Sequence, residues 1–441
     1  MTYSINTNIM LDKEKILQLA SQGKHFCILP WVHFHAWPDS RVMPCCVADS
    51  TKPVSKLQAD QNILDMMNSE QFQEIRKLML EDQPVEVCTR CYELEEMGVT
   101  TMRQSHNLRR GADYADYIAR VTNDDGSLHE FQLKYMDIRF SNLCNMKCRS
   151  CGPGCSSLWA MEIKEKRGAE TFEKYYPNQD VLVNNNPDGA FMQELKHYLA
   201  DVAEVYFAGG EVIITPEHYE CLDYWIEHGL TDQVELNYTT NLSTLRYKKD
   251  VNLIDYWKKF PHIQVWGSLD AHGELAECIR SGTVWRKIED NIRELREQVP
   301  HAQFQITPTI SIWNIFGFGK FMDYMCEKQL IDFDTAPRFN FVTDPWYANI
   351  NILPNHTKQY LVDYYEVYKE RYEGSPGIQQ GFELIINNLR RGQENPGGIL
   401  QFKQFNDELD GFRSERIEEV IPELSDIYQW AADTQIPLAE E

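Results

Sequence analysis

Six short apolar runs that alternate with stretches of helical periodicity constrain the fold of this chain most strongly. The runs lie at 135–140, 203–208, 234–239, 263–268, 303–310 and 338–343. Between them, apolar residues recur every three or four positions, for example Phe191, Leu195 and Leu199, which is the period of a helix with one buried face. Repeated strand–helix units predict an α/β fold in which a parallel sheet with right-handed crossovers forms an open, barrel-like structure.

The length of 441 residues suits a barrel of roughly 250 residues with a smaller partner. Helical patterns follow the barrel, and the clearest lie at 355–372 and 402–412. We therefore expect four segments, which are an N-terminal α+β domain at 1–110, a charged linker at 111–132, the barrel at 133–345 and a mostly helical C-terminal segment at 346–441.

Within the N-terminal domain, a strand-like stretch at 25–35 and a second stretch at 41–46 flank a Pro-Asp-Ser turn, and this pattern predicts a β-hairpin. A helix is expected to begin near Asn68, whose side chain suits an N-cap. His33 and His35 share one face of the first predicted strand, because successive strand side chains alternate. We interpret both as ordinary surface or core histidines rather than ligands.

The charge of the chain narrows its partners. The net charge is −24 at pH 7, and binding along a phosphate backbone needs clustered lysine and arginine, so nucleic acid is an unlikely partner. No apolar run approaches the ~20 residues that cross a bilayer. The first residues are polar and lack the charged and apolar regions of a signal peptide. We therefore expect a cytoplasmic protein without membrane contact.

Twelve cysteines are the most informative term in the composition. Without a secretion signal, metal or redox chemistry is a better interpretation than a disulfide framework. Three scattered cysteines are expected to be buried thiols that act as small apolar side chains. These three are Cys221, Cys278 and Cys326, whereas the remaining nine fall into an N-terminal group and a group at 144–155.

The second group follows directly after the predicted strand at 135–140. Cys144, Cys148 and Cys151 lie within eight residues, so their thiolates can converge on one polynuclear cluster. Zinc sites usually take four ligands in two separated pairs, and three ligands leave one coordination position free. Cys155 is a weaker candidate for a fourth ligand, because the intervening Gly-Pro-Gly is expected to turn the chain away.

The C-x3-C-x2-C loop after a first strand resembles the radical S-adenosylmethionine (SAM) superfamily. The resemblance implies a partial (β/α)6 barrel and a [4Fe–4S] cluster held by Cys144, Cys148 and Cys151. SAM chelates the fourth iron in that family and is cleaved reductively to methionine and a 5′-deoxyadenosyl radical, which abstracts hydrogen from a substrate. The resemblance also implies a ferredoxin- or flavodoxin-type electron donor.

Further motifs follow in the order of the family. Gly209, Gly210 and Glu211 end the second predicted strand and are similar to the family's GGE motif, in which the glycines let the backbone approach a ligand. The resemblance implies that Glu211 accepts hydrogen bonds from the methionyl ammonium of SAM. Asn241 closes the third strand and Asn314 follows the fifth, at positions that resemble those facing the cofactor.

Two more motifs complete the resemblance. Ser268 and Asp270 close the fourth strand and are similar to residues that bind the ribose hydroxyls of SAM. Arg280 matches an arginine that pairs with the SAM carboxylate in many members. One position departs from the pattern, because Ser150 stands where many members carry an aromatic residue against adenine, so adenine packing must come from elsewhere.

The N-terminal cysteines resemble those of the twitch/SPASM-type accessory domain. The resemblance implies that Cys27, Cys45, Cys88 and Cys91 hold an auxiliary [4Fe–4S] cluster. Cys46 is the rival of Cys45, because adjacent strand residues point to opposite faces, and zinc remains an alternative metal for this site. In the best-known members this domain follows the barrel; its N-terminal position here is similar to twitch-containing radical SAM proteins of phage genomes.

The leading hypothesis is therefore a radical SAM enzyme that abstracts hydrogen from an unknown small-molecule or peptide substrate. The main alternative is a catalytically silent iron–sulfur protein that binds SAM or senses redox state. The intact SAM-binding positions Glu211, Ser268, Asp270 and Arg280 favour the enzyme. A zinc-stabilised interaction module is the third hypothesis.

Overall fold

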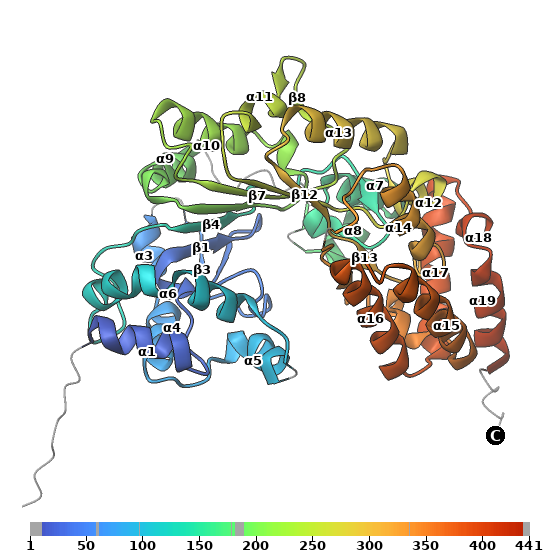
Figure 1. The fold of residues 1–441 in the computed structure, drawn as a ribbon, viewed down its shortest axis with the longest axis horizontal. Helices are drawn as coiled ribbons and strands as arrows, with labels where there is room; N and C mark the ends of the chain where they lie inside the picture. The colour runs from blue at the N-terminus through green and yellow to red at the C-terminus, as the bar shows by residue number, and fades with distance from the viewer. Residues whose placement is uncertain are drawn as a thin grey trace, which may run out of the picture. The chain divides into compact units, whose positions relative to one another are not determined.

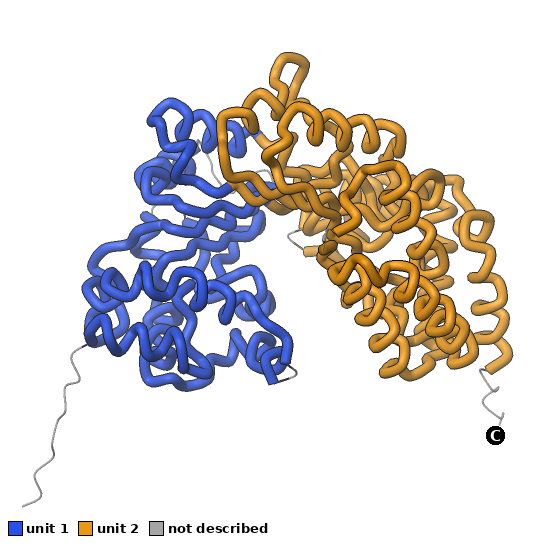
Figure 2. Tube along the Cα trace, in the orientation of Figure 1, with its two compact units in different colours: residues 1–141, 183–207, 216–235 blue, residues 142–182, 208–215, 236–441 orange. Residues whose placement is uncertain are grey.

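A computed structural model describes residues 11–58, 61–96, 98–177, 179–180, 189–334 and 336–434. The chain divides into two compact units (Figure 2), of which unit 1 comprises 1–141, 183–207 and 216–235, and unit 2 comprises 142–182, 208–215 and 236–441. The expected boundaries at 110 and 132 do not divide these units. Each unit is built from several stretches of sequence, because strands and helices alternate along the chain.

Unit 1 combines the predicted N-terminal domain with the first strands of the predicted barrel. Its strands run in the order β6-β4-β1-β2-β3, with β4 parallel to both β6 and β1 and with β2 antiparallel to β1 and β3. The strands are β1 (His33–Ala36), β2 (Arg41–Met43), β3 (Ser55–Lys56), β4 (Tyr135–Ile138) and β6 (Glu204–Phe207). The helices are α1 (Lys13–Gln22), α2 (Leu29–Val32), α3 (Ile63–Met67), α4 (Glu70–Leu80), α5 (Thr89–Glu96), α6 (Met102–Val121), α9 (Ala190–Lys196) and α10 (Pro216–Glu227), with 3-10 turns η1 (Glu86–Cys88) and η4 (Leu199–Asp201).

The expected hairpin forms, but its first strand is shorter than predicted. β1 pairs with β2 so that His35 faces Met43, and Ser40 takes a left-handed conformation, with φ of 73°, in the turn between them. The prediction of a strand over 25–35 is wrong for most of its length. A short helix forms at Leu29–Val32 instead, because Pro30 suits the first turn of a helix.

Two other local expectations also differ from the structure. Helix α4 is capped by Ser69, whose hydroxyl accepts from the backbone of Phe72, and Asn68 instead ends α3. Residues 111–121, which we expected in a linker, form the second half of α6. A capping box begins α6 at Thr101, and the helix lies beside α1 (Figure 1), so its many charges cover only the exposed face.

Unit 2 contains three further predicted strands as parallel neighbours in the order β12-β10-β7. β13 and β14 also pair in parallel, in a separate two-stranded sheet. The strands are β5 (Lys147–Cys148), β7 (Glu235–Thr240), β8 (Arg246–Tyr247), β9 (Val251–Asn252), β10 (Ile263–Gly267), β11 (Arg280–Ser281), β12 (Gln303–Ile306), β13 (Thr309–Ile310) and β14 (Asn340–Phe341). The predicted α/β class with parallel strands is confirmed, whereas the closed arrangement of a partial barrel stays a prediction.

Helices make up the rest of unit 2. Those before the C-terminal segment are α7 (Ser157–Arg167), α8 (Ala169–Tyr175), α11 (Leu253–Trp257), α12 (Gly273–Ile279), α13 (Trp285–Gln298) and α14 (Phe318–Glu327). The segment itself is helical, as expected, with α15 (Asn355–Arg371), α16 (Pro376–Arg391), α17 (Pro396–Arg413), α18 (Ile417–Val420) and α19 (Glu423–Thr434). Short 3-10 turns are η2 (Pro153–Cys155), η5 (Val212–Ile214), η6 (Trp346–Ala348) and η7 (Ile350–Ile352). In the described part of the chain, none of these helices has the length and apolarity to cross a bilayer.

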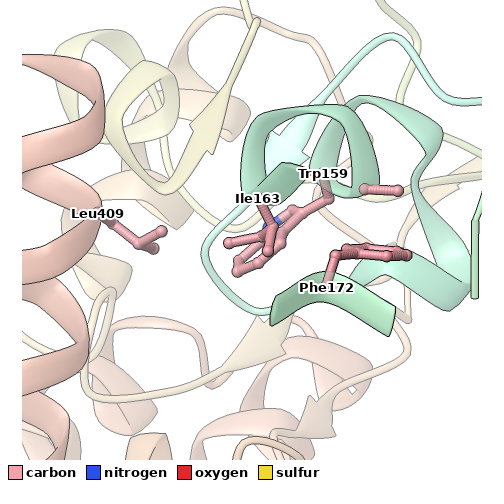
Figure 3. Close-up of a cluster of buried hydrophobic side chains, with 5 residues drawn as sticks. Trp159, Ile163, Phe172 and Leu409 are labelled. Carbon is pink, nitrogen blue, oxygen red and sulfur yellow. The ribbon is translucent and has the colours of Figure 1, made fainter. Parts of the chain in front are cut away.

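A small apolar core joins the region of the cysteine loop to the C-terminal helices of unit 2. Trp159 and Ile163 on α7 and Phe172 on α8 are buried together with Leu409 of α17 (Figure 3). Cys151 packs against this cluster. Because close-packed cores resist displacement, this cluster holds the end of the cysteine loop in place.

Candidate functional site

The three cysteines of the C-x3-C-x2-C loop come together in unit 2. Cys148 lies on β5, opposite Arg280 of β11. Burial raises the pKa of Cys144 to about 12, and the nearby Cys148 thiol adds to the shift. Both of these thiols in turn raise the pKa of Cys151. Three neighbouring buried thiols are a donor set that suits a metal cluster, because binding to iron stabilises the thiolates that burial disfavours.

Arg149, which lies between the second and third cysteines, fastens the loop. Its side chain is fully buried and donates to Asn406 at 3.0 Å, to Asp410 at 2.5 Å and to Glu415 at 2.9 Å. It also donates to the backbone oxygen of Cys278 at 3.2 Å. Helix α17 and the turn after it therefore hold the cysteine loop through a buried guanidinium. We did not single out Arg149 from the sequence, because its partners lie more than 100 residues away.

Glu211 is a buried carboxylate at the end of the second predicted strand. One oxygen accepts from the hydroxyl of Thr240 at 2.7 Å, and the other accepts from the backbone of Asn241 at 2.8 Å. Burial raises the pKa of Glu211, although these donors and Arg280 act in the opposite direction. A buried carboxylate of this kind is stabilised by a cationic partner, which is the chemistry that the GGE resemblance implies.

The glycines before Glu211 are required by the backbone. Gly209 has a φ of 130°, which favours glycine. A Cβ on Gly210 would lie 2.7 Å from the carbonyl carbon of Leu143, well inside ordinary contact. The backbone N–H of Glu211 donates to the Leu143 carbonyl at 2.6 Å. The GGE segment and the residue before Cys144 are therefore packed backbone to backbone.

Asp270 and Arg280 form an ion pair. Arg280 Nε lies 2.7 Å from Asp270 Oδ2, and Asp270 Oδ1 accepts from the backbone of Thr309 at 2.8 Å. Arg280 also places a guanidinium nitrogen 3.7 Å from the Cys148 sulfur. Burial would lower the pKa of Arg280, but Asp270 and Cys148 raise it above its usual range. The two residues expected to bind different parts of SAM therefore contact each other and one cluster cysteine.

The remaining predicted positions lie around these groups. The Asn241 side chain donates to Asn145 of the cysteine loop at 2.9 Å. Asn314 donates to the backbone oxygen of Asp270 at 3.2 Å, so it holds the strand end rather than an open space. The backbone of Ser268 donates to Thr240 at 2.8 Å, and its side chain is half-buried.

The structure places Cys155 differently from the prediction. We expected the Gly-Pro-Gly segment to turn the chain away, but the 3-10 turn η2 brings Cys155 back beside Cys151. A hydrogen bond with the Cys155 thiol is the largest cause of the raised pKa of Cys151. The physical reason is local, since Cys155 N–H donates to the carbonyl of Gly152 at 3.1 Å and closes the turn. Cys155 itself is exposed.

A second set of four thiols lies together in unit 1. Cys27, Cys45, Cys88 and Cys91 line one cavity, together with apolar side chains and Arg103. Burial raises the pKa of Cys45 to about 12, and the neighbouring Cys91 thiol acts in the same direction. The four predicted cysteines are thus brought together by β2, η1 and α5. The rival Cys46 does not line this cavity.

The spacing of these thiols bears on the choice between zinc and an iron–sulfur cluster. Sulfurs around one zinc ion at about 2.3 Å lie roughly 3.8 Å from one another. Among the described residues, no three cysteine sulfurs lie within 4.8 Å of one another. The four thiols therefore surround a wider space than one ion fills, which suits a polynuclear cluster.

Residues 27–92 match a known family, the SPASM iron–sulfur cluster-binding domain. Residues 27–92 form a SPASM domain. The match covers all four cysteines of the cavity in unit 1, and it confirms the recognition of a radical SAM protein whose SPASM-type accessory domain is placed N-terminally. With the SPASM domain come the expected cofactors, [4Fe–4S] clusters and SAM.

Solved structures share similarity with just over half of the chain. One is anSMEcpe with bound AdoMet and the Kp18Cys peptide, at 15% identity and a TM-score of 0.36, covering 54% of this chain and 60% of that chain. Another is SuiB of Streptococcus suis bound to S-adenosylmethionine, at 14% identity and 0.29, covering 58% and 54%. A third is TYW1 with a lysine-pyruvate adduct, at 17% and 0.24, covering 45% and 58%. No curated protein matches.

Proposed function

We propose that the chain is a radical SAM enzyme that cleaves SAM reductively and abstracts hydrogen from its substrate. The observation that carries the proposal is the junction of the cysteine loop with the GGE segment. There, three neighbouring thiols lie on a loop whose backbone accepts a hydrogen bond from Glu211. The loop supplies ligands for iron, and Glu211 supplies the anionic partner of an ammonium group.

In this proposal Cys144, Cys148 and Cys151 hold the [4Fe–4S] cluster. When bound, that cluster supplies the electron that splits SAM into methionine and a 5′-deoxyadenosyl radical. Glu211 binds the ammonium group of SAM and fixes its orientation, because a charge-assisted hydrogen bond is strong and directional. Arg280 lies against Cys148 and compensates negative charge beside the thiolates.

The SPASM domain takes a second cluster in the same proposal. Cys27, Cys45, Cys88 and Cys91 are its ligands, supported by the shared cavity and by the sulfur spacing. Arg103 lines that cavity and lowers the pKa of Cys27 against the larger effect of burial. A ferredoxin- or flavodoxin-type protein is the proposed electron donor, and a small molecule or peptide the proposed substrate.

One observation favours a second candidate function, a silent SAM-binding or redox-sensing protein. Both oxygens of Asp270 are already engaged, by Arg280 and by the backbone of Thr309. An enzyme that binds the ribose through Asp270 must rearrange these contacts. The rival therefore predicts that SAM binds without being cleaved.

The test is anaerobic assay of the full-length protein. We expect about eight iron atoms per chain from two [4Fe–4S] clusters and formation of 5′-deoxyadenosine from SAM with dithionite, measured by chromatography. Cys144→Ala should abolish this product, and Cys88→Ala should keep uncoupled cleavage with half of the iron. Cys326→Ala, a cysteine outside both groups, is the matched control and should change neither. Full clusters that bind SAM without producing 5′-deoxyadenosine would favour the silent protein.

A further inference from the structure

Unit 1 contains a group of buried metal-binding side chains that neither cluster uses. His33 and His35 lie on β1, and Asp137 lies on the neighbouring parallel strand β4, directly opposite His35. Each of the three offers one ligand atom within 4.8 Å of the others. Their side chains are almost fully buried, with relative exposures of 1%, 0% and 0%. In the described part of the chain, no other such group of three occurs.

The hydrogen bonds of the two histidines fix which ring nitrogen is available. Nδ1 of His33 lies 2.8 Å from the backbone oxygen of Tyr135, and Nδ1 of His35 lies 2.8 Å from that of Asp137. A carbonyl oxygen only accepts, so Nδ1 carries the hydrogen in both rings. In the neutral ring Nε2 then holds the lone pair. Metal-binding histidines are typically oriented in this way, by donation from the other ring nitrogen to a carbonyl or carboxylate.

The opposite side of the group lacks hydrogen-bond partners. Nε2 of His33, Nε2 of His35 and both carboxylate oxygens of Asp137 are buried without one. His35 Nδ1 lies 3.1 Å from Asp137 Oδ2, and Arg139 Nε lies 3.8 Å from Oδ1, but neither makes a hydrogen bond to the carboxylate. A buried polar group without a partner costs about 1–3 kcal/mol, so four of them in one place need a common explanation.

We propose that His33, His35 and Asp137 bind a divalent first-row transition ion such as Zn²⁺. Two imidazoles and one carboxylate are ligands that zinc and iron(II) both accept. Ligand atoms at about 2.1 Å from one ion lie roughly 3.4 Å apart, so the present arrangement closes around an ion with small side-chain movements. The ion supplies the positive charge that buried Asp137 lacks within hydrogen-bonding distance.

Cys46 gains a place in this proposal. Burial and the nearby Asp137 carboxylate raise its pKa, which puts the thiol next to the site and away from the auxiliary cavity lined by Cys45. The adjacent pair thus divides between two sites, as neighbouring residues on opposite faces do. A thiol beside two imidazoles favours zinc, for which sulfur is a good ligand.

The experiment uses full-length protein isolated anaerobically, with both clusters present, and Zn²⁺ as the probe. After incubation with Zn²⁺ and desalting, we expect one equivalent of retained zinc. Its X-ray absorption fine structure should show nitrogen and oxygen neighbours at about 2.0–2.1 Å, with at most one sulfur at about 2.3 Å. Zinc that replaced iron in a cysteine site would instead show mainly sulfur neighbours.

The variants His35→Gln and Asp137→Asn should weaken zinc binding at least about tenfold and leave the iron content unchanged. His106→Gln is the matched control, because His106 is also buried and stacks on Tyr135 but belongs to no such group. Wild-type protein that retains no zinc with imidazole neighbours would overturn the proposal, whether or not the variants fold. Equal zinc binding by wild type and both variants would overturn it as well.

Discussion

The close approach of the GGE segment to the cysteine loop makes Gly210→Ala a sharp test of the proposed site. The added Cβ would lie 2.7 Å from the carbonyl carbon of Leu143 and 2.8 Å from that of Asn142, whereas ordinary contact begins near 3.4 Å. Backbone must therefore move by at least about 0.7 Å, and Leu143 directly precedes Cys144. Overpacking of this kind costs about 1–3 kcal/mol, and a displacement near 1 Å at a reacting centre costs about 100-fold in rate.

The assay compares Gly210→Ala with Gly411→Ala. A Cβ on Gly411 meets nothing within 4 Å, and alanine within helix α17 should stabilise it by about 0.5–1 kcal/mol. We expect Gly210→Ala to lose most 5′-deoxyadenosine formation and part of the iron, while Gly411→Ala behaves as wild type. Undiminished cleavage by Gly210→Ala would show that the two segments do not need their close packing, and would refute this account.

Three further outcomes follow from the contacts of unit 2. Arg149→Met should lower the free energy of unfolding by about 3 kcal/mol, since it breaks a buried ion pair; Arg167→Met, which breaks a half-exposed pair, should cost under about 1 kcal/mol, and denaturant titration giving equal losses would contradict this. Cys155→Ala should keep the full iron content, and loss of about four irons would identify Cys155 as a ligand. Thr240→Val removes a donor to Glu211 worth about 1.5 kcal/mol or more, so SAM affinity measured by calorimetry should fall about tenfold; an unchanged affinity would separate Glu211 from SAM binding.

The motifs at strand ends were readable from sequence because each is local. Cys144, Gly210 and Asp270 each follow a short apolar run, and the carboxyl ends of parallel strands meet at one edge of a sheet. The parallel order of β7, β10 and β12 follows from the same alternation. The accessory domain was predicted from the order of its cysteines, and the SPASM match covers them.

The departures arose where distant residues or local turns decide the outcome. The charged stretch at 111–121 is helical because its apolar face packs on α1, a partner that composition does not reveal. Cys155 lies beside Cys151 because a single 3-10 turn closes between them. His33 and His35 were interpreted as ordinary histidines, since their relation to Asp137 exists only once β1 pairs with β4. Nonlocal pairing of this kind leaves no spacing in the sequence.

The pairing of β1 with β4 also has a consequence for how the chain is made. The two strands are separated by 102 residues, as in the bond from His33 to Tyr135. At about 5–20 residues per second, β1 leaves the ribosome roughly 5–20 seconds before its partner. During that time one edge of the hairpin is open to other strands. Synthesis rate and chaperone access, rather than final stability, should therefore govern the yield of soluble protein.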